Sequence, residues 1–141
     1  MTEEIITKKI DQMRGLLDRL DALLAVPFEV FRKDLTAIAA AERNFQLLVD
    51  IASDLNTQIT IERKIRTADT YQQSFARLAD AGIVPRDMAE RLIAGAKIRN
   101  ILVHEYDFEE DYEKFYASAK DLAPVFREYA RIIYAYVRKN E

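Results

Sequence analysis

Apolar side chains recur every three or four residues along most of the chain, which is the spacing of one face of an α-helix. Two long runs follow this pattern, and Pro27 separates them. The first run consists of Ile6, Ile10, Met13, Leu17, Leu20 and Leu24. The second consists of Ile38, Ala41, Phe45, Leu48, Ala52, Leu55 and Ile59. These runs predict two long antiparallel helices joined by a short loop.

Shorter helices are expected in the second half of the chain. Thr70 and Gln73 have the spacing of a capping box, which predicts the start of a short third helix. Gly82 stands where a helix C-cap belongs, and Pro85 suits the first turn of a fourth helix. We expect that fourth helix to run to about Tyr106.

The acidic stretch 107–111 indicates a break before the last helix. An apolar repeat from Leu122 to Tyr136 predicts that helix, with Pro124 tolerated only in its first turn. No strand pattern or internal repeat is present in the sequence. The expected fold is all-α: an up-and-down bundle of two long antiparallel helices plus shorter ones, forming one domain over residues 1–141.

Composition supports a compact helical protein. Half of the 141 residues are hydrophobic and 32% are charged, and cysteine is absent, so neither disulfides nor thiolate metal sites are expected. No apolar run approaches the ~20 residues needed to span a bilayer, and the mixed-charge N-terminus is unlike a signal peptide. We therefore expect a cytoplasmic protein. The net charge of −3 argues against broad, sequence-independent binding of nucleic acid.

Candidate chemistry is concentrated in the run RNILVHEY, which contains Arg99, Asn100, His104 and Tyr106. His104 is the single histidine of the chain. On a helix Asn100 and His104 share a face, Arg99 and Tyr106 form a neighbouring stripe, and Arg99 and His104 are ~140° apart. The apolar residues of this segment are expected to face the core; these are Ile98, Ile101 and Leu102.

This set of side chains suits phosphodiester cleavage in RNA. Histidine exchanges protons near neutral pH, and arginine binds phosphate and offsets its developing charge. Asn100 can orient either group. The run has no serine or cysteine nucleophile, whereas RNA supplies its own 2′-hydroxyl.

Other interpretations compete with this one. A lone histidine on a helix flank is more often a structural residue than a catalytic one. A dinuclear metal bundle is excluded, because its Glu-x-x-His motif requires an acid at Ile101. A phosphotransfer domain also presents one histidine on a helix, but Glu105 and Asp107 would repel a phosphoryl group there.

The motif Arg99-Asn100-x3-His104-x-Tyr106 resembles that of the HepT-like toxins of the HEPN superfamily. The segment ERNFQLLVDIASDLN (residues 42–56) is similar to the second-helix segment of that family, and residues 70–116 are similar to its central region. The first and last helices match in character only.

The resemblance implies a HEPN-like bundle that forms a homodimer, with Arg99 and His104 in a cleft between the copies. It implies a metal-independent endoribonuclease without cofactor, the toxin of a type VII-like toxin–antitoxin pair. The substrate would be RNA and not DNA, and no membrane is involved. The implied antitoxin is a minimal nucleotidyltransferase (MNT) that transfers AMP to Tyr106. The alternative is a catalytically silent helical dimer that only binds a nucleotidyltransferase or another protein.

Three further features have two possible roles each. Asp50 and Asp54 either orient Arg99 or His104 or lie on a solvated helix face, which is the favoured interpretation. The charged run 62–66 either guides an RNA backbone or is an ordinary charged loop. Gly95 is expected to permit close approach of another helix, within the bundle or across the dimer.

Overall fold

Helices make up most of the computed structural model, which describes residues 3–104 and 108–140, with side chains for 3–102 and 112–140. They are α1 (Glu3–Leu24), α2 (Phe28–Phe31), α3 (Leu35–Glu62), α4 (Tyr71–Asp80), α5 (Arg86–His104) and α6 (Phe108–Lys139). The described residues contain no strand, so the predicted all-α class is confirmed. None of these helices combines the length and apolarity needed to cross a membrane.

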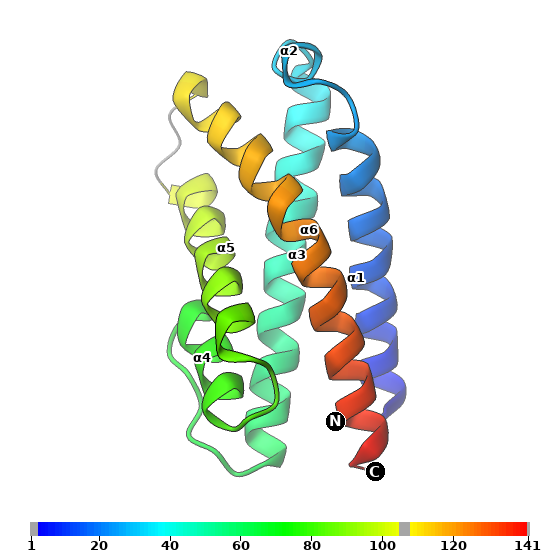
Figure 1. Ribbon diagram of the computed structural model, residues 1–141, viewed down its shortest axis with the longest axis vertical. Helices are drawn as coiled ribbons and strands as arrows, with labels where there is room; N and C mark the ends of the chain where they lie inside the picture. Colours follow the sequence, from blue (N-terminus) through cyan, green and yellow to red (C-terminus); the bar gives the residue numbers. More distant parts are fainter. Residues whose placement is uncertain (1–2, 105–107, 141) are drawn as a thin grey trace.

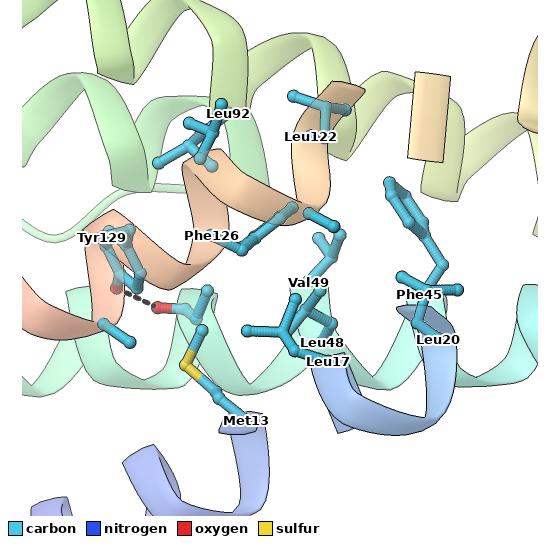
Figure 2. Close-up of a cluster of buried hydrophobic side chains, with 14 of the residues drawn as sticks. Met13, Leu17, Leu20, Phe45, Leu48, Val49, Leu92, Leu122, Phe126 and Tyr129 are labelled. Carbon is cyan, nitrogen blue, oxygen red and sulfur yellow. Dashed lines mark hydrogen bonds between the residues drawn. The ribbon is translucent and has the colours of Figure 1, made fainter. Parts of the chain in front are cut away.

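The two long helices predicted from the apolar repeat are α1 and α3, and α6 lies alongside both (Figure 1). α4 and α5 pack at one side of α3. Figure 2 shows the hydrophobic core of the bundle, where side chains from α1, α3, α5 and α6 meet. Its buried members include Met13, Leu17, Phe45, Leu48, Leu92, Phe126 and Tyr129. Burial of each large apolar side chain contributes about 1.5–3 kcal/mol to stability.

The predicted boundaries of α4 are confirmed in detail. The Thr70 hydroxyl accepts from the Gln73 backbone N–H at 3.1 Å, while the Gln73 side chain accepts from the Asp69 N–H at 3.0 Å. Gly82 has a φ of +74°, and it ends the helix with its N–H bonded to the Ala79 carbonyl. Glycine has no Cβ to oppose this left-handed conformation.

The last helix is longer than predicted. α6 begins at Phe108, so Pro124 lies inside it and not in its first turn. Proline removes one backbone N–H donor from a helix, at a cost of about 3 kcal/mol. Burial of Ala123, Val125 and Phe126 on either side of it stabilises the continuous helix. The expected break at 107–111 is therefore wrong for residues 108–111, and residue 107 lies outside the described residues.

Gly95 permits a close contact inside the bundle. A Cβ at this position would lie 3.3 Å from Leu122 Cδ1 and 3.7 Å from two ring carbons of Phe126. α5 and α6 can therefore approach each other more closely than an alanine would allow.

A buried polar network joins three helices. The Tyr129 hydroxyl of α6 is hydrogen-bonded to the Asn56 side chain and lies 3.0 Å from the Ala52 carbonyl oxygen, both on α3. Asn56 donates to Ser74 Oγ of α4 at 3.0 Å. Tyr129, Asn56 and Ser74 are at most 2% exposed, so their polar groups depend on one another for hydrogen bonds.

We predict that Tyr129→Phe destabilises the fold by about 2 kcal/mol, because it leaves buried groups without a partner. Thermal or urea unfolding would measure the change. Tyr134→Phe is the matched control, since the Tyr134 hydroxyl is bonded to exposed Arg138 on the same helix. Equal stability of the two variants would contradict the structural role of this network.

Candidate functional site

Arg99 is fixed by a carboxylate from another helix. Its Nε lies 3.2 Å from Asp50 Oδ1, and the side chains of Arg99 and Asp50 are 18% and 31% exposed. The two residues are 49 apart in sequence and are brought together by the packing of α5 against α3. A partly buried pair of this kind is screened less by salt than an exposed surface pair.

The ring of Tyr71 covers one side of the Arg99 guanidinium. Arg99 Cζ lies 4.8 Å from the ring centroid, in the geometry of a cation–π contact. Burial, followed by hydrogen bonding to Asp50 and its negative charge, raises the pKa of Tyr71 above the ordinary value of 10.0, although Arg99 opposes this shift. The phenol is therefore protonated at neutral pH.

These contacts leave the outer part of the guanidinium available. Arginine carries five N–H donors, and Asp50 engages the one on Nε. In the part of the chain that the structure describes, neither terminal amino group of Arg99 has a hydrogen-bond partner. The arrangement therefore presents a positioned pair of donors with the geometry that binds an oxyanion such as phosphate bidentately.

The two aspartates of α3 have different roles. Asp50 orients Arg99, so the expectation of a solvated face is wrong for this residue. Asp54 is 65% exposed and lies 3.7 Å from Lys9 Nζ, as expected for a solvated face. The structure therefore joins Asp50, Tyr71 and Arg99, which we call the Arg99 cluster.

The other motif residues are only partly described. Asn100 is half-buried on α5. His104 is the last residue of α5, but its side chain lies outside the described residues, as does the whole of Tyr106. Their proximity to the Arg99 cluster therefore stays a prediction. Among the described residues, no group of three or more His, Cys, Asp or Glu side chains is arranged to hold a metal ion.

One apolar residue of the motif helix faces outward, contrary to expectation. Ile101 is 38% exposed, whereas Ile98 and Leu102 pack against the core as predicted. Ile101 follows buried Ala96 by five residues, which places it about 140° away around the helix. The buried face of α5 is therefore narrower than expected, because it includes Ile98 and Leu102 but not Ile101.

Sequence reasoning did not identify Tyr71 as a site residue. It is the first residue of α4 after the Thr70 cap, and its contact with Arg99 of α5 joins residues 28 positions apart in the sequence. No local spacing marks such a contact. The position of an aromatic residue directly after a cap was the only available signal.

Comparison with known proteins gives a consistent result. The model of the family described as "Ribonuclease HepT-like" matches residues 6–133. The chain is similar to a tRNA nuclease HepT of Aphanizomenon flos-aquae, at 26% identity over 80% of this chain and 77% of that protein.

Two solved structures share the fold. One is a tri-AMPylated HEPN toxin of Shewanella oneidensis in complex with an MNT antitoxin, with TM-score 0.86 and 21% identity over 96% of this chain and 99% of that one. The other is YutE of Bacillus subtilis, a cytosolic protein of unknown function, with TM-score 0.77 and 19% identity over 95% and 92%. Since the family model covers most of its length, the chain belongs to the HepT-like ribonuclease family.

Proposed function

We propose that this protein is a metal-independent endoribonuclease, the toxin of a type VII-like toxin–antitoxin pair. The observation that carries the proposal is Arg99, five residues before the single histidine. It is held by Asp50 and Tyr71, and its terminal amino groups have no partner among the described residues. Family membership and the named tRNA nuclease relative support it. That relative makes tRNA the first substrate to test.

In the proposed reaction, the 2′-oxygen of a nucleotide attacks the adjacent phosphorus and the bond to the 5′-oxygen breaks. One proton leaves the 2′-hydroxyl and one reaches the departing 5′-oxygen. His104 serves as the general base or the general acid. Arg99 binds the phosphate and offsets the negative charge of the transition state, and Asn100 orients His104 or the phosphate.

We propose that the active form is a homodimer. Arg99 and His104 are about 140° apart on a regular helix, so one phosphate does not easily reach both side chains of one copy. Two copies facing each other across a cleft can pool their motifs. Exposed Ile101 on the same helix supports a contact surface close to the motif.

We propose that an MNT-type nucleotidyltransferase neutralises the toxin by transferring AMP to Tyr106. The Tyr106 oxygen would attack the α-phosphorus of ATP, and pyrophosphate would leave. Support comes from the matching structure of an AMPylated HEPN toxin in complex with its MNT antitoxin. The alternative is a catalytically silent helical dimer that binds a nucleotidyltransferase without cleaving RNA.

The chemistry of the cleaved ends tests the proposed reaction. We expect labelled RNA incubated with the protein in EDTA to yield 2′,3′-cyclic phosphate and 5′-hydroxyl ends. A substrate with one 2′-deoxynucleotide at the scissile position should resist cleavage, because it lacks the nucleophile. Mass spectrometry of the fragments identifies the ends. Cleavage of the deoxy substrate, or products with 5′-phosphates, would contradict the mechanism, and an inactive native protein would favour the silent dimer.

A further inference from the structure

The α3–α4 loop, residues 63–70, carries a concentration of positive charge. Arg63, Lys64 and Arg66 lie within four residues of one another, and all three are exposed. Arg63 donates to the Tyr136 hydroxyl at 2.8 Å. In the described part of the chain, no ion pair includes Lys64 or Arg66.

Lys64 occupies a position where glycine is favoured. Its φ is +57°, and its backbone N–H is bonded to the Ile61 carbonyl at 3.1 Å. The chain ends α4 in the same way, but with Gly82 at the equivalent position. A residue with a Cβ pays about 1 kcal/mol for this left-handed conformation. A lysine in this strained conformation points to a use for its side chain.

The loop has a defined path toward the Arg99 cluster. Arg77 of α4 donates to the Arg66 carbonyl at 3.1 Å. From there the loop leads into Tyr71, whose ring contacts the Arg99 guanidinium. The Cα atoms of Arg66 and Tyr71 are separated by no more than about 18 Å, the reach of five extended residues. In Figure 1 this connection leaves the end of α3 and runs beside the bundle to α4.

We propose that Lys64 and Arg66 bind phosphates of the RNA substrate outside the scissile position. The inference rests on the proposed ribonuclease function and adds a binding track to it. An RNA strand with one phosphate on Arg99 extends along the loop and meets the two unpaired cations. This track reconciles a net charge of −3 with an RNA substrate, because the positive charge is concentrated where the strand lies.

Binding of a non-cleavable 2′-O-methyl RNA tests the track independently of catalysis. Lys64→Gln/Arg66→Gln should weaken binding about tenfold, and should lower the slope of log affinity against log salt by about 1.4, as expected for two lost phosphate contacts. Lys120→Gln/Arg131→Gln, on α6, removes the same charge from other exposed positions and should leave both quantities unchanged. Fluorescence anisotropy across a salt series measures them.

A second variant separates binding from a purely structural role. Lys64→Gly relieves the left-handed backbone and removes the cation, so it should bind RNA less tightly while its melting temperature is unchanged or higher. If the native protein cleaves RNA but both loop variants bind RNA as tightly as the α6 control, the loop inference is wrong while the proposed ribonuclease function stands. If the loop variants lose binding only to the nucleotidyltransferase, the RNA assignment is overturned. If native protein neither binds nor cleaves RNA, the proposed function fails as well.

Discussion

Arg99→Ala and His104→Ala should each reduce RNA cleavage by at least about 10²-fold. The Arg99 change removes the cation that Asp50 and Tyr71 hold in place, and the His104 change removes the only imidazole of the chain. Growth inhibition in cells should disappear with either change. Initial rates on labelled RNA measure the effect directly.

The matched control is Lys97→Ala, which removes an exposed cation from the same helix and should leave cleavage nearly unchanged. Asp50→Asn should give an intermediate loss of about tenfold, because Arg99 remains but is less firmly oriented. Circular dichroism and thermal melts confirm that each variant is folded. A well-folded His104→Ala protein with native cleavage rates would refute the ribonuclease mechanism.

Local patterns in the sequence were sufficient to predict most of the helices. The apolar repeat of α1 and α3 is a property of neighbouring turns, and the caps at Thr70 and Gly82 depend on residues within one turn. α2 has only four residues, too few for a repeat to be recognised. α6 was misjudged at Pro124, because burial on both sides of the proline stabilises the helix and no local rule includes that energy.

The site was predictable only in part for a related reason. The motif identifies Arg99 through spacing along one helix, but the groups that orient Arg99 come from two other helices. Asp50 looked like part of a solvated face, because sequence alone does not say which surface of α3 will be covered by α5. Tyr71 was marked only by its position directly after the Thr70 cap, since its contact with Arg99 depends on how α4 is placed. Residues that contact a functional group from another helix can be identified only from the tertiary structure.

Tyr106 is the expected acceptor of AMP, since it follows His104 by two residues and Arg99 by seven. Seven residues are close to two helical turns, so a helix continued to this position would place Tyr106 on the Arg99 side. The adenylate adds a phosphodiester charge and a bulky adenosine. The charge can pair with Arg99, and the adenosine should exclude RNA from the site.

Tyr106→Phe should therefore abolish modification by the antitoxin while the protein still cleaves RNA. After incubation with the nucleotidyltransferase, ATP and Mg²⁺, peptide mass spectrometry should place AMP on the peptide that contains Tyr106 in the native protein and on no peptide in the variant. Tyr116→Phe is the control, because the Tyr116 hydroxyl already donates to the Val26 carbonyl at 2.6 Å and should not serve as an acceptor. Equal modification of Tyr106→Phe and native protein, or AMP located on Tyr112 or Tyr116, would show that the acceptor is a different tyrosine.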